Sequence, residues 1–275
     1  MSSLELGIVS DEISLDFREA LNLGLEWGIT LYELRCLKTG RLPAVDPAEL
    51  QDVENLVKER GVTITALSPG IFKHPVSQTK ELEHELAETL PRSFDLAHRL
   101  GASLLLVFGF KQDPGGREGQ VGRAVEIMSR AAEQAADAGI RIAIENEPGF
   151  VCDSGTNTAS FIEQVGSPLV GANWDPCNGY GTPERPYPEG YEALKKHIFN
   201  VHVKDTKAGS LIQCVPVGDG NIDWKGQMGA LLRDGIVGHV SIETHCLPLI
   251  ENSRRNVEIL RQYLGELAAS TGKSQ

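Results

Sequence analysis

Four side chains of the types that bind divalent metal ions lie at the ends of short apolar segments of the chain. They are Glu145, Asp175, His202 and Glu243. If these segments are neighbouring parallel strands, their carboxyl ends meet at one edge of the sheet and the four side chains converge. Two carboxylates about 4 Å apart repel each other by roughly 4 kcal/mol at an effective dielectric constant of 20. Three converging carboxylates therefore need a cation or protons, and we interpret the four residues as one metal site rather than as separate ion pairs.

The chemistry of this ligand set narrows the choice of metal. Three carboxylates and one imidazole are typical of Mn²⁺ or Mg²⁺. We expect one Mn²⁺ per chain, with Mg²⁺, Co²⁺ or Zn²⁺ as alternatives. Such an ion would polarise a carbonyl and its neighbouring hydroxyl and acidify the adjacent C–H bond. Glu145 and Glu243 come from well-separated segments, so they could face opposite sides of a substrate carbon and act as a catalytic acid/base pair.

Eight alternations of an apolar segment and an amphipathic segment position these residues. The strands are expected at 5–10, 30–35, 62–68, 103–108, 141–148, 169–175, 198–204 and 239–245. The helices are expected near 15–27, 47–60, 79–100, 119–138, 157–166, 189–197, 224–235 and 250–268. This count predicts an α/β fold, a parallel (β/α)₈ TIM barrel formed as a single domain over residues 1–275. A doubly wound open sheet is the alternative, but the Gly-rich turn that usually follows its first strand is absent from the sequence.

Composition restricts the classes of function. The formal net charge of −12 disfavours non-specific nucleic-acid binding, which needs a positive surface. The sequence has no run of about 18 apolar residues, so no membrane-spanning segment is expected. Its amino terminus lacks the pattern of a secretory signal, and its five cysteines show no C-x-x-C spacing. We therefore expect a cytoplasmic enzyme with reduced thiols, and the sequence leaves open whether it forms a homo-oligomer.

Three further residues are candidates for substrate binding, each with a structural alternative. Arg35 shares a strand face with Glu33, so it either forms an internal salt bridge or binds a substrate carboxylate or phosphate. His74 is either a substrate contact or an exposed loop histidine. Lys204 binds a substrate oxygen or pairs with the adjacent Asp205.

Several short motifs resemble a known family. They are Ile144-Glu-Asn146, Asp175-Pro-x-Asn178, His202-Val-Lys-Asp205, Gly218-Asp-Gly-Asn-Ile-Asp-Trp224 and Ile242-Glu-Thr-His245. Together they resemble the xylose isomerase-like barrels. More narrowly, they resemble the sugar phosphate isomerase/epimerase family, which includes ketose 3-epimerases, hydroxypyruvate isomerases and inosose dehydratases. The resemblance covers nearly the whole chain. It implies a metal at Glu145, Asp175, His202 and Glu243, with Glu145 and Glu243 moving a proton through an enediolate, and Asn178 joins the expected substrate contacts.

The function expected from residues and resemblance together is that of a metal-dependent isomerase or epimerase. Its substrate would be a small sugar, a ketose or a related polyhydroxy carbonyl compound. Two alternatives stay open: a dehydratase or lyase that uses the same site, and a non-catalytic sugar-binding barrel. The AP endonucleases of the same superfamily are disfavoured, because Asn178 stands where their motif has histidine and no histidine ends the fourth predicted strand.

Overall fold

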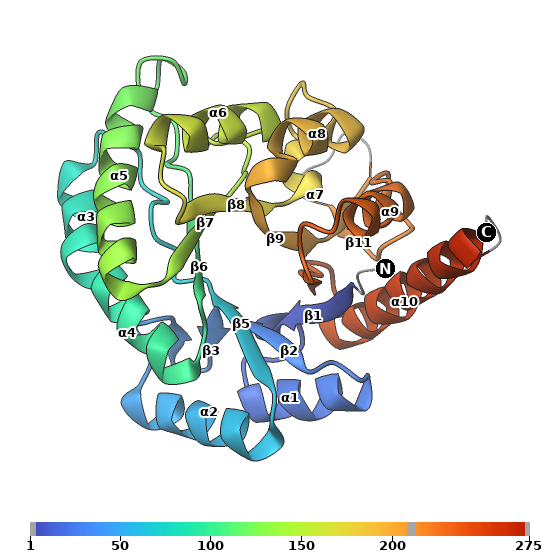
Figure 1. Ribbon diagram of the computed structural model, residues 1–275. Coiled ribbons are helices and arrows are strands. Elements are labelled where there is room, and N and C mark those ends of the chain that lie inside the picture. The colour runs from blue at the N-terminus through green and yellow to red at the C-terminus, as the bar shows by residue number, and fades with distance from the viewer. Residues whose placement is uncertain (1–3, 208–212, 273–275) are drawn as a thin grey trace.

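Eight parallel strands form a closed barrel in the computed structural model, which describes residues 4–207 and 213–272 (Figure 1). The order around the barrel is β1-β12-β9-β8-β7-β6-β5-β2. The strands are β1 (Glu5–Val9), β2 (Leu31–Leu34), β5 (Thr63–Leu67), β6 (Leu104–Phe108), β7 (Arg141–Glu145), β8 (Val170–Trp174), β9 (Ile198–Val203) and β12 (His239–Ile242). All five residues of β6 and of β8 are buried, as expected for parallel strands covered on both faces. The predicted (β/α)₈ barrel is confirmed.

Helices surround the barrel and follow the strands in the expected alternation (Figure 1). They are α1 (Phe17–Glu26), α2 (Pro47–Arg60), α3 (Thr79–His84), α4 (Leu90–Leu100), α5 (Val121–Ala138), α6 (Gly155–Val165), α7 (Pro176–Gly179), α8 (Tyr191–Leu194), α9 (Trp224–Asp234) and α10 (Leu249–Gly272). Local sequence sets their limits. Before α2, for example, the Asp46 side chain accepts a hydrogen bond from the backbone N–H of Ala48, and Gly61 ends the helix with a φ of 65°. Within the described residues, no helix is both long and apolar enough to cross a bilayer.

Three local features depart from the regular alternation. The predicted helix over 79–100 is interrupted by a π-helical turn, Glu85–Thr89. The segment predicted as a helix over 189–197 is helical but irregular, because it joins the end of a π-helical turn (Pro186–Gly190), α8 and a 3₁₀ turn (Lys195–His197). Two antiparallel hairpins were not predicted: β3 (Cys36–Leu37) with β4 (Gly40–Arg41), and β10 (Asp205–Thr206) with β11 (Cys214–Val215).

The interior of the barrel contains an apolar cluster and a polar network. The apolar cluster consists of Ala66, Leu104, Leu106 and Ala143, with Phe199 packed against it. In the polar network, the amide of Asn200 donates to Glu33 Oε2 (3.3 Å) and to Asn173 Oδ1 (3.0 Å). Glu33 also contacts His202, so this network supports the predicted metal site from within the barrel.

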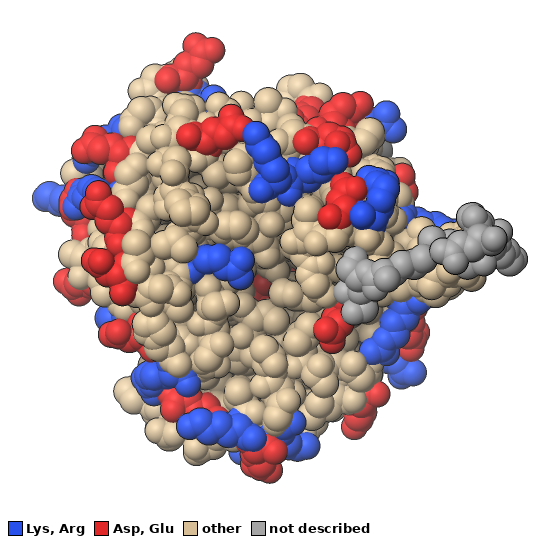
Figure 2. Space-filling model, viewed as in Figure 1, with Lys and Arg blue, Asp and Glu red and all other residues tan. Residues whose placement is uncertain are grey.

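Surface charge is distributed rather than concentrated on the face shown in Figure 2. Acidic and basic side chains are intermixed around its periphery. The net charge of −12 therefore does not form one continuous acidic patch on the described part of this face.

Candidate active site

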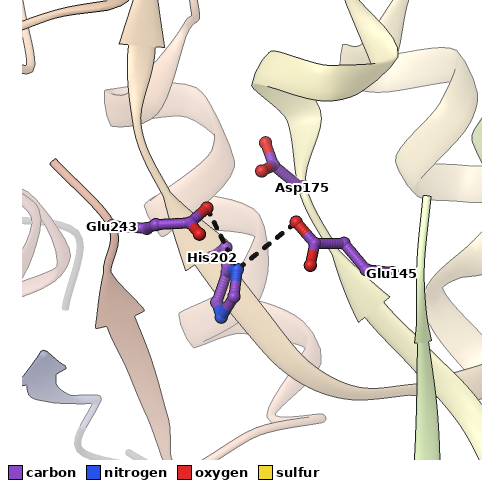
Figure 3. A group of neighbouring side chains, drawn as sticks. All are labelled: Glu145, Asp175, His202 and Glu243. Atoms are coloured by element: carbon purple, nitrogen blue, oxygen red, sulfur yellow. Dashed lines mark ion pairs between the residues drawn. The ribbon is translucent and has the colours of Figure 1, made fainter. Parts of the chain in front are cut away.

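The four predicted ligands meet at the carboxyl end of the barrel (Figure 3). Glu145 is the last residue of β7, His202 lies on β9, and Asp175 and Glu243 directly follow β8 and β12. One ligand atom from each residue lies within 4.8 Å of those from the other three. Each residue is at most 5% exposed. Strand ends in a parallel barrel share one face, and this geometry brings residues almost 100 positions apart in sequence into one cluster.

His202 is oriented by a buried carboxylate. Its Nε2 lies 3.1 and 3.0 Å from the two carboxylate oxygens of Glu33, which is fully buried on β2. Its Nδ1 faces the cluster, 3.2 Å from Glu243 Oε2 and 3.6 Å from Glu145 Oε1, without a well-aligned hydrogen bond within the described residues. A carboxylate that holds the distal nitrogen while the other nitrogen points into a ligand cluster is typical of metal-binding histidines.

Electrostatics also favour a cation at this point. Burial lowers the pKa of His202, but the carboxylates of Glu33, Glu243 and Glu145 outweigh burial and raise that pKa well above its ordinary value. A proton on the imidazole is thus one way to balance the surrounding negative charge. A divalent ion bound at Nδ1 would balance more of it, so the residues fit a metal ion.

Lys204 already neutralises part of the cluster. Its Nζ lies 2.7 Å from Asp175 Oδ2 and 2.9 Å from Glu243 Oε2, and the side chain is buried. The expected alternative, a pair with Asp205, is not formed. Asp205 instead accepts hydrogen bonds from the backbone N–H groups of Thr206, Gly218, Gly220 and Ile222. It therefore holds the loop that follows β11.

Arg35 forms ion pairs with three carboxylates, and none of them is Glu33, the partner expected if both residues lay on the same face of the strand. It donates to Glu243 Oε1 and Glu12 Oε1 at 2.6 Å and to Asp11 Oδ2 at 2.9 Å. The expected salt bridge to Glu33 is absent from the described residues. The reason is that β2 ends at Leu34, so Arg35 lies beyond the strand and no longer alternates with Glu33. Arg35 and Lys204 together hold both oxygens of Glu243.

Two asparagines fix the positions of the carboxylates. The Asn178 amide donates to Glu145 Oε1 (3.2 Å), and the Asn178 backbone N–H donates to Asp175 Oδ1 (3.0 Å). The Asn146 side chain makes a reciprocal pair of 2.8 Å hydrogen bonds with the backbone of Asp175. The ends of β7 and β8 are thereby tied together, which fixes the separation of Glu145 and Asp175.

A cavity of about 220 Å³ opens above the cluster. Of the predicted substrate residues, Arg35, Asn178 and Lys204 line it. The structure does not bring His74 to its wall. The His74 ring hydrogen-bonds Gln78 Oε1 (2.9 Å) and lies 3.7 Å from Glu85, while its neighbour Lys73 lines the cavity.

The cavity has further wall residues. Glu147 is one, and burial together with the charge of Glu145 raises its pKa to about 7. Cys214, on the unpredicted hairpin, is another, and sequence reasoning missed it. A hydrogen bond from the Cys177 thiol lowers the pKa of Cys214 to about 7 and, with burial, raises the pKa of Cys177. Parity places Glu147 on the face of Glu145, but the sequence carries no comparable signal for Cys214.

A family model described as a xylose isomerase-like TIM barrel matches residues 21–263. Solved structures with the same fold include an L-ribulose 3-epimerase (TM-score 0.80, 18% identity, 99% of this chain and 98% of that one). A D-allulose 3-epimerase from Methylomonas sp. in complex with D-allulose gives a TM-score of 0.75 at 18% identity, covering 96% and 98%. A probable 3-DHS dehydratase from Bacillus anthracis gives 0.75 at 17% identity, covering 94% and 98%. At these identities the likeness establishes the fold.

A curated relative matches only part of the chain. It is an uncharacterized protein of Methanocaldococcus jannaschii, 30% identical over 142 residues. The match covers 50% of this chain and 47% of that relative, so the chain spans about half the length of the curated relative it matches.

Proposed function

Because the chain belongs to the xylose isomerase-like TIM-barrel family, we propose that it is a divalent-metal-dependent isomerase or epimerase. The substrate class is a small sugar, ketose or related polyhydroxy carbonyl compound. The observation that carries the proposal is the convergence of Glu145, Asp175, His202 and Glu243 within 4.8 Å at the base of a cavity. Structural neighbours named as 3-epimerases support the choice of reaction.

Within this proposal the four residues hold the metal, with Mn²⁺ as the expected ion and Mg²⁺, Co²⁺ or Zn²⁺ as alternatives. A divalent ion bound there would polarise the substrate carbonyl and its neighbouring hydroxyl. Glu33 keeps the Nδ1 of His202 directed at the site. The small cavity suits a substrate of few carbons, because pockets for drug-sized ligands are typically about 300–1,000 Å³.

Glu145 and Glu243 are the proposed proton carriers. They extend toward the cluster from opposite sides (Figure 3), and β8 and β9 separate their strands in the barrel. One carboxylate would take the proton from the carbon next to the carbonyl, and the other, after taking up a proton from solvent, would return it to the opposite face. Burial raises the pKa of Glu243, but Lys204, His202 and His245 overcome this effect and hold it well below its ordinary value. Glu243 is therefore ionised at neutral pH.

A dehydratase is the second candidate. The structural likeness to a probable 3-DHS dehydratase favours it, and elimination of water begins with the same removal of a proton next to a carbonyl. In that case Glu145 or Glu243 keeps its role as base, and a neighbouring hydroxyl leaves instead of a proton returning to carbon.

The deciding experiment is incubation of the Mn²⁺-loaded protein with a panel of small ketoses and aldoses in D₂O. Deuterium in an isomerised or epimerised sugar supports the main proposal, and loss of water supports the dehydratase. A protein that binds the ion but catalyses neither reaction on any sugar would be a non-catalytic sugar-binding barrel. Glu145→Gln and Glu243→Gln should each lower the exchange rate by about 10²–10⁴-fold. The exposed Glu81→Gln on α3 is the matched control and should retain full activity.

A further inference from the structure

Arg41 lies on the cavity wall without a carboxylate partner. It is carried by β4, in the first unpredicted hairpin. Its Nε donates to the backbone oxygen of Ser68 (3.1 Å), and its Nη2 donates to the Ser68 hydroxyl (3.2 Å). A guanidinium has five N–H donors, so most of its donors are left for another acceptor. No ion pair joins it to a carboxylate among residues 4–207 and 213–272.

Lys73 is a second cation on the same wall. Its Nζ lies 4.0 Å above the centre of the Phe108 ring, a cation–π contact that supplies no negative charge. Within the described part of the chain, Lys73 forms no ion pair with a carboxylate either. We call Arg41 and Lys73 the cationic wall. We call the cluster of Glu145, Asp175, His202 and Glu243 the carboxylate wall, of which Glu145 and Glu243 line the cavity directly.

The two cations stand in contrast to the other basic groups of the cavity. Arg35 contacts three carboxylates and Lys204 contacts two. Burial is the main cause that lowers the pKa of Arg41 and of Lys73, and repulsion from Arg41 adds to the shift of Lys73. The carboxylates of Glu145 and Glu147 act on Lys73 in the opposite direction without overcoming burial and repulsion.

The backbone holds both cations in place. Gly70, with a φ of 80°, lies under Arg41, and a Cβ at this position would come within 2.6 Å of Arg41 Nε. Phe72, which precedes Lys73, has a φ of 65°, an uncommon conformation for a residue other than glycine. Its N–H donates to the carboxylate of Glu85 (2.9 Å), and its carbonyl accepts from the N–H of Phe110 (3.1 Å). The loop is thus tied on two sides, and strained backbone of this kind is concentrated at functional sites.

From this geometry we infer that the cationic wall binds an oxyanion of the substrate, a carboxylate or a phosphate monoester. The substrate class is then an acidic polyhydroxy carbonyl compound, with its hydroxy-carbonyl end at the carboxylate wall and its anionic group between Arg41 and Lys73. The reaction assigned to this substrate rests on the proposed function. The binding preference rests only on the two walls of the cavity.

The test compares three small achiral ketones that share a hydroxymethyl ketone and differ in the group on its other side. They are dihydroxyacetone, hydroxypyruvate and dihydroxyacetone phosphate. Binding to the Mn²⁺-loaded protein is measured by calorimetry at low ionic strength. At least one of the two anions should bind about tenfold or more tightly than dihydroxyacetone, since charge-assisted hydrogen bonds to Arg and Lys are the strong ones. The preferred anion identifies the substrate as a carboxylate or a phosphate.

Substitutions of Arg41 and Lys73 test whether these two residues cause the preference for an anion. Arg41→Met and Lys73→Met should each lower the affinity for the preferred anion about tenfold and change the affinity for dihydroxyacetone less than twofold. Lys73→Arg should restore most of the affinity, because it restores the charge. Lys58→Met, at an exposed position of α2, is the matched control and should bind all three ligands as the original protein does. Circular dichroism confirms that each variant is folded.

Three results would overturn the inference. The first is equal affinity for the three ketones. The second is no measurable binding of either anion at about 10-fold the concentration at which dihydroxyacetone saturates the protein. The third is an anion preference that survives in the folded double variant of Arg41 and Lys73. None of these results depends on turnover. Deuterium exchange of a neutral ketose without anion preference would leave the proposed function intact, and anion preference without any exchange would leave the binding site intact.

Discussion

The two walls of the cavity are built differently. The carboxylate wall consists of residues at strand ends, where acidic groups are compensated by Lys204, Arg35 and the Glu33–His202 contact. The cationic wall lies on two loops that follow β2 and β5, and neither of its two charges forms an ion pair with a carboxylate within the described residues. Charges that are paired within the protein keep their positions when no substrate is bound. Charges without an ion-pair partner can instead pair with a bound substrate.

The largest expected difference is between Lys204, which pairs with the carboxylate wall, and Lys73 of the cationic wall. Lys204→Met should lower the free energy of unfolding of the metal-free protein by about 3–5 kcal/mol, because it leaves Asp175 and Glu243 buried without their partner. Lys73→Met should change it by less than about 0.5 kcal/mol, as at ordinary surface positions. Urea denaturation in the presence of a chelator measures both. Equal costs would show that the two lysines are not in different electrostatic settings.

Metal addition should stabilise the protein through the carboxylate wall alone. At a Mn²⁺ concentration about 100 times Kd, the expected gain is about 2.7 kcal/mol, or roughly 5–10 °C in Tm. Differential scanning calorimetry with and without chelator measures it. Asp175→Asn should remove most of the gain, whereas Arg41→Met should keep it. A full gain in Asp175→Asn would mean that the ion binds elsewhere.

Glu33→Gln should weaken Mn²⁺ binding by about 10–100-fold, because the amide no longer fixes the protonation and orientation of His202 as a carboxylate does. Titration calorimetry gives the affinity. Glu85→Gln is the matched control, since Glu85 is also a buried carboxylate but supports the loop of the cationic wall. Its metal affinity should be unchanged, and a loss there would show that the two walls are coupled.

The smallest effect concerns Cys214, which lies on the cavity wall. With a pKa of about 7, lowered from the usual thiol value, its reactive thiolate forms as the pH rises through 7. Its rate of alkylation by iodoacetamide should therefore increase between pH 6 and 8 and then level off. Cys246, whose pKa burial raises to about 11, should still be reacting faster with each pH step at pH 9. Peptide mass spectrometry separates the two sites, and identical pH profiles would contradict the expected thiol contact.

The residues of the carboxylate wall could be predicted from the sequence because the ends of the strands are easy to locate. Each predicted ligand lies at or near the end of a short, mostly apolar run, and eight such runs imply a barrel whose strand ends share one face. The role of Glu33 was harder to predict. Side chains two apart on a strand share a face, which would place Glu33 beside Arg35, but β2 ends at Leu34 and the alternation stops there. Its contact with His202 joins residues 169 positions apart, so no local pattern reveals it.

The cationic wall could not be found in the sequence for a different reason. Strands β3 and β4 have two residues each, too short for any alternation of apolar and polar residues to be recognised. The positive φ at Phe72 has no signature in the residue type, because it is imposed by the hydrogen bonds to Glu85 and Phe110. The prediction of His74 as a substrate contact pointed to the right loop, but the structure turns the neighbouring Lys73 and not the histidine toward the cavity.

The π-helical turn Glu85–Thr89 gives this barrel a way to change the substrate that it binds without moving the four metal-binding residues. Such a turn is an α-helix with one additional residue. Removal of that residue would rotate Glu85 by about 100° relative to the rest of the helix and withdraw its carboxylate from the Phe72 N–H. Lys73 would then lose its anchored loop, while the strand ends that carry the four ligands kept their register. A single codon deletion outside the cavity would thus act on the anion-binding loop while the metal ligands kept their positions.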